Sequence, residues 1–133
     1  MRPICPWKSQ VSDENHPIIF IRHGETDWNK RGLIQGTIDT DLNEKGHEQA
    51  RTIARKLAAN RQMFQGYDLV CSPQKRARQT MAHLVVALER DSHHVQLEDR
   101  VRELGFGVWE SKPFWELKAS PVYPPHPEDR YYW

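Results

Sequence analysis

The sequence predicts an α/β fold, with a mainly parallel sheet that has helices on both faces. Short apolar runs of strand-favouring residues alternate with segments of helical spacing, in the order strand, helix, strand, helix, strand. This alternation favours parallel strands joined by right-handed crossovers. The chain has 133 residues, which is enough for one domain of ordinary size.

The first predicted element is a buried strand over residues 18–22. Four adjacent apolar residues of strand-favouring types can be covered on both faces of a sheet. Arg22 and His23 stand at its C-terminal end, where side chains of an open α/β sheet project into the ligand-binding crevice. Gly24 lets the chain turn sharply at this point.

A long loop then leads into the first helix. Residues 24–42 form the loop, with turn signals at Gly32 and Gly36, and a long ordered loop beside a candidate reactive residue is usually functional. The helix is expected over residues 44–60, with Asn43 as its N-cap. Its apolar face repeats at helical spacing and consists of Ala50, Ile53, Ala54, Leu57 and Ala58.

The second half of the pattern repeats strand and helix. Residues 67–71 are the next predicted strand, and Ser72 and Pro73 are expected to be the N-cap and the first residue of the second helix. Residues 95–97 are a short third strand. The apolar face of the second helix consists of Ala77, Met81, Leu84, Val85 and Leu88.

Composition limits the class of protein. Lysine and arginine number 19 against 18 acidic residues, a formal net charge of +1, which gives no support for a nucleic-acid or anionic-membrane binder. No apolar run approaches the ~20 residues of a membrane helix, and the N-terminus has no signal-peptide core. Cys5 and Cys71 form no metal or redox motif, and Cys71 is expected to be a buried free thiol. We therefore expect a soluble, cytoplasmic protein. A disulfide between the two cysteines is the alternative to free thiols.

The two ends of the chain differ from its middle. Residues 1–16 are polar, contain two prolines and show no clear period, so they predict an irregular N-terminal extension to a domain over residues 17–133. From Pro113 onward prolines and aromatic residues dominate, which indicates either a loop that packs on something or an unfinished segment.

Polar residues that suit phosphate chemistry follow the predicted strands. A neutral imidazole flanked by cations, as at His23, is equipped to attack an electrophile in anionic surroundings. Arginine binds phosphate oxygens through a planar fork of donors, and Arg76 lies in the first turn of a helix, which also favours an anion. Glu103 offers a carboxyl group for proton transfer.

Each of these residues also has an ordinary interpretation. His23 could simply cap a strand, Arg76 could be a solvated arginine, and Glu103 could pair with a neighbouring arginine. Their occurrence together, in this order along the chain, is what favours a phosphate site. The segments are Arg22-His23-Gly24-Glu25, Asn29 with Gln35-Gly36, Ser72-Pro73-Gln74-Lys75-Arg76-Ala77, and Arg102-Glu103-Leu104-Gly105-Phe106-Gly107.

These segments resemble the signature of the histidine phosphatase superfamily, also called the phosphoglycerate mutase-like family. The resemblance covers roughly residues 18–118 and is highly specific, because the motifs recur in the family's order. They are Arg22-His23-Gly24-Glu25-Thr26, Trp28-Asn29, Leu33-Ile34-Gln35-Gly36, Asp39, Asp41-Leu42-Asn43, Gly46, Cys71-Ser72-Pro73, Lys75-Arg76-Ala77, Thr80, and the run from Arg102 to Glu110.

The resemblance implies a role for each catalytic residue. His23 matches the histidine that attacks phosphorus and carries a transient phosphohistidine. Arg22 and Arg76 match the arginines that hold the phosphoryl oxygens, and Glu103 matches the acid that protonates the leaving group. Cations near His23 should also keep its imidazole neutral, since like charge disfavours the imidazolium form.

The resemblance also implies a binding set and a class of ligand. Asn29 matches a phosphate-pocket residue, and Gln35 with Gly36 matches loop positions that line the substrate. The implied partner is a phosphorylated small molecule. No metal and no cofactor are expected, because phosphoryl transfer needs mainly positioning and neutralisation of negative charge.

One family feature is missing from the sequence. Family members carry a second His-Gly motif after a late apolar strand, and no His-Gly follows His23 here. We therefore expect the N-terminal part of a histidine phosphatase, C-terminally incomplete. The missing strand would lie beside the first strand, so its absence would expose an edge through which the chain can self-associate.

The favoured activity is phosphomonoester hydrolysis, impaired in the chain as given. The run from Leu33 to Gly36 resembles the phosphatase branch, and the short distance from Trp109 to the terminus leaves little room for a mutase-type insertion. A phosphoglycerate mutase is the alternative enzyme. A protein that binds phosphorylated ligands without turnover, or a structural fragment, is the alternative outside enzymes.

Overall fold

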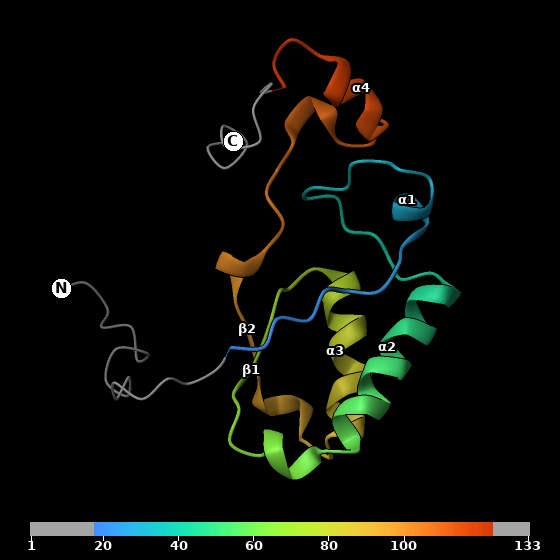
Figure 1. The fold of residues 1–133 in the computed structure, drawn as a ribbon. Coiled ribbons are helices and arrows are strands. Elements are labelled where there is room, and N and C mark those ends of the chain that lie inside the picture. The colour runs from blue at the N-terminus through green and yellow to red at the C-terminus, as the bar shows by residue number, and fades with distance from the viewer. Residues whose placement is uncertain (1–17, 124–133) are drawn as a thin grey trace, which may run out of the picture.

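The computed structural model describes residues 18–123, which form an α/β arrangement with a small parallel sheet (Figure 1). The predicted extension at residues 1–16, Cys5 and residues 124–133 lie outside the described residues. The elements in chain order are α1 (Asp27–Lys30), α2 (Glu44–Ala58), η2 (Arg61–Phe64), β1 (Leu69–Cys71), α3 (Lys75–Ala87), η3 (Ser92–His94), β2 (Val95–Leu97), η4 (Asp99–Val101), η5 (Gly107–Trp109) and α4 (Phe114–Ala119). No helix among residues 18–123 is long and apolar enough to cross a membrane.

The sheet consists of β1 and β2, which confirms the predicted parallel pairing. Leu69 lies opposite Val95 and Cys71 opposite Leu97, and α3 is the connection between the two strands. The β1 strand begins at Leu69, two residues later than predicted. Cys71 is a buried free thiol, as predicted, and burial raises the pKa of this thiol.

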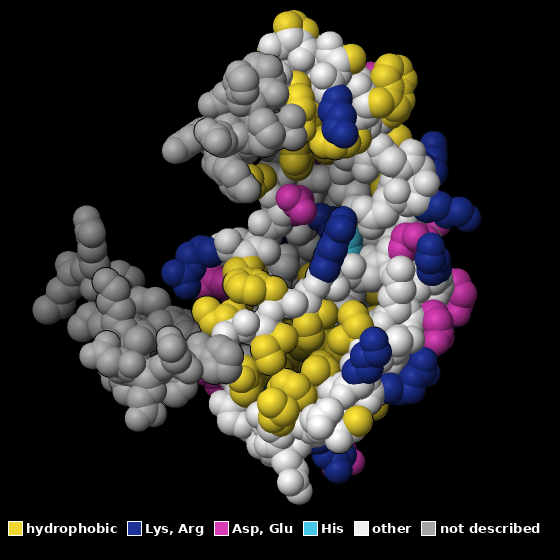
Figure 2. All heavy atoms as spheres, viewed as in Figure 1, with side chains coloured by type: hydrophobic (Ala, Val, Ile, Leu, Met, Phe, Trp, Pro, Cys, Tyr) yellow, Lys and Arg dark blue, Asp and Glu magenta, His cyan; other side chains and the backbone are white. Residues whose placement is uncertain are grey.

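The predicted strand at residues 18–22 is not formed, so this prediction is wrong for the described residues. The segment crosses in front of β1 in the view of Figure 1, but β1 pairs with β2 alone. A strand needs a hydrogen-bonded neighbour, and none of the described residues supplies one to this segment. Ile18 and Phe20 are 76% and 87% exposed rather than buried. Figure 2 shows hydrophobic side chains gathered on one face of the molecule. Self-association through an open sheet edge stays a prediction.

The first long helix forms almost as predicted. The Asn43 side chain caps α2, because its Oδ1 accepts a hydrogen bond from the N–H of Gly46 at 2.9 Å. The helix ends at Ala58 instead of residue 60. Small buried residues of α2, among them Ala50 and Ala54, allow α3 to pack closely. On α3 and at its C-cap the buried apolar residues are Leu84, Val85 and Leu88.

The start of α3 differs from the prediction. Gln74, not Ser72, is the N-cap, and the helix begins at Lys75. The reason is a tertiary contact: the Asp39 carboxylate accepts the N–H of Lys75 at 2.6 Å. Residue 39 lies far away in sequence, so local capping rules do not detect this partner. Pro73 precedes the helix and does not occupy its first position.

The segment around α4 is tied to the loop at residues 32–36. Leu33 and Pro113 form an isolated antiparallel bridge, and the N–H of Phe114 donates to the carbonyl of Gly32 at 2.9 Å. The N–H of Ile34 donates to the carbonyl of Lys112, also at 2.9 Å. In Figure 1 α4 and this loop lie together at one end of the molecule, on the opposite side of the site from β1 and β2.

Two glycines allow α2 to approach the turn that carries His23. A β-carbon on Gly24 would overlap the backbone of Gly46, and one on Gly46 would overlap the carbonyl oxygen of Glu25. The N–H of Asn43 donates to that same carbonyl of Glu25 at 2.9 Å. The first turns of α2 therefore pack directly, backbone against backbone, on residues 24 and 25.

We expect Gly46→Ala to lower the free energy of unfolding by about 1–3 kcal/mol, because the added methyl group meets rigid backbone. Gly66→Ala is the matched control, since a β-carbon there has no neighbour within 4 Å, and its effect should stay within about 0.5 kcal/mol. Urea unfolding of both variants checks this. Equal losses would contradict the close approach of α2 to the turn.

Candidate active site

The candidate site is a cavity of about 310 Å³ between the turn at His23, the loop at residues 32–36 and the segment before η5. Of the seven residues predicted from the sequence, all except Arg76 line it. Its lining consists of Arg22, His23, Asn29, Gly32, Leu33, Ile34, Gln35, Gly36, Glu103, Phe106 and Phe114. The structure thus brings together predicted residues from three of the four predicted segments.

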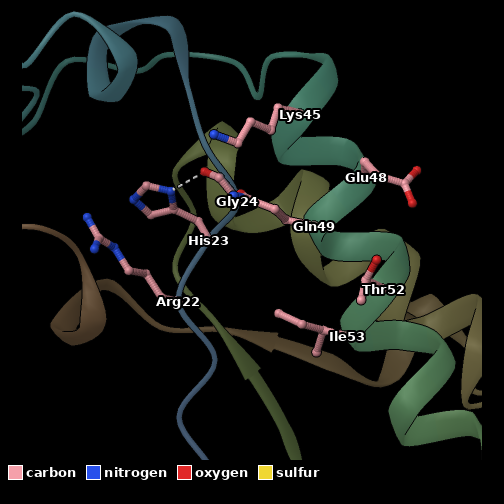
Figure 3. A pocket seen from close by; sticks show the side chains of 8 residues that line it. All are labelled: Arg22, His23, Gly24, Lys45, Glu48, Gln49, Thr52 and Ile53. Carbon is pink, nitrogen blue, oxygen red and sulfur yellow. Dashed lines mark hydrogen bonds between the residues drawn. The ribbon is translucent and has the colours of Figure 1, made fainter.

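A second, open cavity of about 370 Å³ lies on the other side of the same turn. Arg22, His23 and Gly24 line it from the turn, and Lys45, Glu48, Gln49, Thr52 and Ile53 line it from α2. Figure 3 shows the side chains of Arg22 and His23 pointing to one side of the turn, away from α2. His23 lines both cavities.

A backbone carbonyl fixes the tautomer of His23. Its Nδ1 lies 2.7 Å from the carbonyl oxygen of Gly24, the bond drawn as a dashed line in Figure 3. A carbonyl oxygen only accepts, so Nδ1 carries the proton and Nε2 keeps its lone pair. The N–H of Gly24 donates in turn to the hydroxyl of Thr80 at 3.1 Å. The imidazole is thus held by a turn that is itself bonded to α3.

The surroundings of His23 favour the neutral ring. Burial lowers the pKa of the imidazole most, and the charges of Arg76 and Arg22 lower it further. The hydrogen bond to Gly24 and the charge of Glu103 act in the opposite direction, and the net pKa lies below 6.5. An unprotonated Nε2 beside two arginines is a nucleophile placed for an anionic electrophile.

Arg76 is buried beneath the cavity and not within it. Its side chain is 1% exposed, which excludes a solvated arginine. The two terminal amino groups donate to the carbonyls of Ile38 at 2.9 Å and Gly36 at 3.0 Å. No carboxylate of the described residues lies within ion-pair distance, and the Nε atom is buried without a partner. Burial lowers the pKa of this guanidinium, while Glu103 and Asp39 raise it.

Gly36 is fixed by contacts on both sides. Its carbonyl accepts from Arg76 and from Nε2 of Gln74, each at 3.0 Å. Its φ of +53° lies in the left-handed region, and a β-carbon would overlap the carboxylate of Glu110. That carboxylate accepts the N–H of Thr37 at 2.8 Å. Only glycine fits this position without displacing the loop.

Asn29 presents a donor to the cavity. Its Oδ1 accepts the N–H of Thr26 at 3.1 Å, which fixes the orientation of the amide. Its Nδ2 then has no bonding partner among the described residues. Gln35 is buried, and its Oε1 accepts from the hydroxyl groups of Thr26 and Thr40. Amide N–H groups therefore supplement Arg22 as donors at this wall of the cavity.

Glu103 contributes a carboxyl group on the wall that it shares with His23. Its backbone N–H donates to Oε1 of Gln74 at 3.1 Å, which anchors the residue. Its side chain forms no ion pair or hydrogen bond within residues 18–123, whereas the neighbouring Arg102 pairs with Asp99 at 3.6 Å. The interpretation of Glu103 as an ordinary ion-pair partner of arginine is therefore wrong for the described residues.

Sequence reasoning missed the part that Gln74 plays. Its amide group bridges Gly36 and Glu103, two segments of the site that are far apart in sequence. The residue stood inside a quoted motif, but nothing in its type or spacing indicated this bridging contact. Among residues 18–123 no three potential metal ligands of the His, Cys, Asp or Glu type lie close together.

Fold and site together define an α/β protein with a half-buried histidine on a cavity that also contains Arg22, Asn29 and Glu103. The model of the histidine phosphatase superfamily (branch 1) matches residues 18–131. The chain therefore belongs to the histidine phosphatase superfamily, branch 1, as the sequence predicted. The family's phosphoglycerate mutase-like fold is confirmed as well.

Curated and solved relatives agree with this membership. Phosphoserine phosphatase 1 of Hydrogenobacter thermophilus is 32% identical over 117 residues, which are 87% of this chain and 49% of that protein. The crystal structure of an Entamoeba histolytica phosphoserine phosphatase with 3-phosphoglyceric acid has a TM-score of 0.62 at 33% identity and covers 76% of this chain and 46% of that one. A mycobacterial glucosyl-3-phosphoglycerate phosphatase in complex with VO3 also has a TM-score of 0.62, at 30% identity, over 84% of this chain and 49% of that one. The chain spans about half the length of these relatives.

The lowered pKa of His23 has a measurable sign. Between this pKa and 6.5 the folded state binds fewer protons than the unfolded state, so stability decreases as pH falls through that range. We expect an NMR titration of the ring to give a midpoint below 6.5, and Arg22→Gln to raise it, since the charge of Arg22 lowers the pKa. Arg55→Gln, far along α2, is the control. A wild-type midpoint above 6.5 would contradict the electrostatic description.

Proposed function

We propose that the protein hydrolyses phosphate monoesters through a phosphohistidine on His23. The observation that carries the proposal is the bond from Nδ1 of His23 to the carbonyl of Gly24, which leaves the Nε2 lone pair free beside a cavity lined by donors. Family membership supports the same reaction. In this proposal His23 is the nucleophile, Arg22 and Asn29 form the anion site and Glu103 is the acid, and all four residues line one cavity.

The reaction has two steps. In the first, Nε2 of His23 attacks phosphorus, the bond to the leaving-group oxygen breaks, and the carboxyl group of Glu103 gives that oxygen a proton. In the second, water attacks phosphorus of the phosphohistidine, the bond between phosphorus and Nε2 breaks and restores the neutral imidazole, the Glu103 carboxylate takes up a proton of the water, and phosphate leaves. Arg22 and the amide of Asn29 neutralise and orient the phosphoryl oxygens in both steps.

The substrate we propose is a phosphorylated small molecule. The similar proteins are named as phosphoserine and glucosyl-3-phosphoglycerate phosphatases, and one solved relative holds 3-phosphoglyceric acid. These names favour release of phosphate over the mutase alternative. Formation of an isomeric phosphoglycerate without free phosphate would favour the mutase, and phosphate binding without turnover would favour the non-catalytic alternative.

We expect His23→Ala to abolish acid-labile labelling of the protein by a phosphomonoester, because no other described histidine lines the cavity. The matched control is His93→Ala, which removes an exposed ring bonded to Asp91. Labelling is measured after rapid mixing of each protein with the ester and an acid quench of part of the sample. Undiminished labelling in His23→Ala would overturn the assignment of the nucleophile.

Two adjacent cations on α3 should differ in their effect on phosphate binding. Arg76 is buried below the cavity, whereas Lys75 is exposed and lies 3.9 Å from Asp41. We expect Arg76→Ala to weaken inorganic phosphate binding at least about tenfold, since it removes the charge-assisted hydrogen bonds, worth roughly 1.5–3 kcal/mol each, that hold the loop at Gly36 against the cavity. Lys75→Ala should change it little. Calorimetric titration decides, and equal losses would indicate a diffuse basic patch.

A further inference from the structure

A histidine pair outside both cavities joins the two long helices. Nδ1 of His47 on α2 lies 3.0 Å from Nε2 of His83 on α3, and the rings meet edge to face with centroids 5.4 Å apart. Both side chains are half-buried. Neither residue takes part in the reaction described above, so the contact calls for another explanation.

The chemistry of this bond depends on the number of protons on the pair. An N–H···N hydrogen bond needs one ring nitrogen with a proton and one with a free lone pair. At least one imidazole must therefore be neutral. When both rings carry two protons, each of the facing nitrogens is a donor, the bond is lost, and two cations stand in contact. The contact is thus compatible with a pair charge of zero or one, but not two.

The neighbours of the pair make the second proton harder to add. Burial lowers the pKa of His83 most, and the charges of His47 and Arg51, both on α2, lower it further. The Arg51 guanidinium is itself held by Glu44 at 3.3 Å and Glu48 at 2.9 Å, which keeps it on this face of α2. The two groups on α2 that lower the pKa of His83 are therefore a guanidinium, that of Arg51, and a second imidazole, that of His47.

The pair is attached closely to the turn that carries His23. His47 directly follows Gly46, whose backbone packs against Gly24. On α3, His83 lies one turn after Thr80, whose hydroxyl accepts the N–H of Gly24 at 3.1 Å. The relative position of α2 and α3 consequently fixes the environment of Gly24 from two sides.

We propose that His47 and His83 are positioning residues that form an acid-sensitive latch between α2 and α3 and thereby hold the turn of His23. The latch is closed while at least one of the two rings is neutral. Acid opens it by placing a proton on both, which separates the helices where they clamp Gly24. This proposal concerns the placement of the turn and does not depend on the hydrolytic reaction.

The sign of the effect follows from the proton count. Because the folded state resists the second proton and the unfolded state does not, the unfolded state binds more protons below about pH 6.5. Stability conferred by the latch is therefore complete above that pH and decreases below it. The lowered pKa of His23 also reduces the free energy of unfolding as pH falls. The experiment must therefore compare variants that retain His23.

The test is the melting temperature of the 133-residue chain between pH 7 and pH 5. His83→Gln keeps a side chain able to bond His47 but cannot take up a proton. We expect the wild type to lose at least about 4 °C more than His83→Gln over this range, the order of shift that ~1 kcal/mol gives in a domain of this size. His93→Gln, at an exposed ring, should behave like the wild type.

Two further measurements keep the proposal falsifiable. His47→Gln should reduce the acid loss as much as His83→Gln, and the double variant no more than either, because one bond is shared. Opening of the latch should lower the protection of the Gly24 amide against hydrogen exchange, relative to its intrinsic rate at each pH, more in the wild type than in His83→Gln. Equal acid losses in wild type and both single variants, or unchanged Gly24 exchange, would overturn the latch. Phosphatase activity enters none of these readouts.

Discussion

The burial of one guanidinium governs both the shape and the charge of the site. Removing an arginine from water costs of the order of several kcal/mol unless its donors are satisfied, and Arg76 obtains carbonyls of Gly36 and Ile38 but, among residues 18–123, no carboxylate. The loop must therefore follow the path that presents those carbonyls. Because no described carboxylate pairs with this guanidinium, its charge adds to burial in lowering the pKa of the His23 imidazole. If Arg76 formed a salt bridge in the same place, it would still hold the loop, but its charge would lower the pKa of His23 less.

Gln74 extends the constraint from Arg76 to the other walls of the cavity. Its amide group donates to the carbonyl of Gly36 and accepts the backbone N–H of Glu103, so the loop at residues 32–36 and the backbone at residue 103 are fixed to the start of α3. Glu110 secures the loop from the opposite side through Thr37. Contacts between segments that are distant in sequence therefore position the cavity walls, and positioning is the main demand of the proposed reaction. Among the described residues, the side chains of Gln74, Arg76 and Glu110 link these walls to each other by hydrogen bonds.

Local patterns predicted the helices and the two paired strands, because hydrophobic periodicity and the Asn43 cap are properties of short stretches. The start of α3 was missed because Asp39, which accepts the N–H of Lys75, comes from another part of the chain. The predicted strand at residues 18–22 does not form, because a strand needs a hydrogen-bonded neighbouring strand, which the described residues do not provide. The cavity residues were found through motif order, whereas Gln74 acts through a contact that no spacing encodes.

The two cavities at His23 differ in their capacity for proton transfer. The cavity beside α2 contains Glu48, whose carboxylate is bound by Arg51 and Arg55, and these hydrogen bonds lower the pKa of its carboxyl group. The other cavity contains Glu103, whose carboxyl group is bound by none of the described residues. The His23 ring points away from α2 (Figure 3). In the proposed reaction the carboxyl group that is not bound by arginines is the better candidate to give the leaving group its proton, which favours the 310 Å³ cavity as the place of the ester.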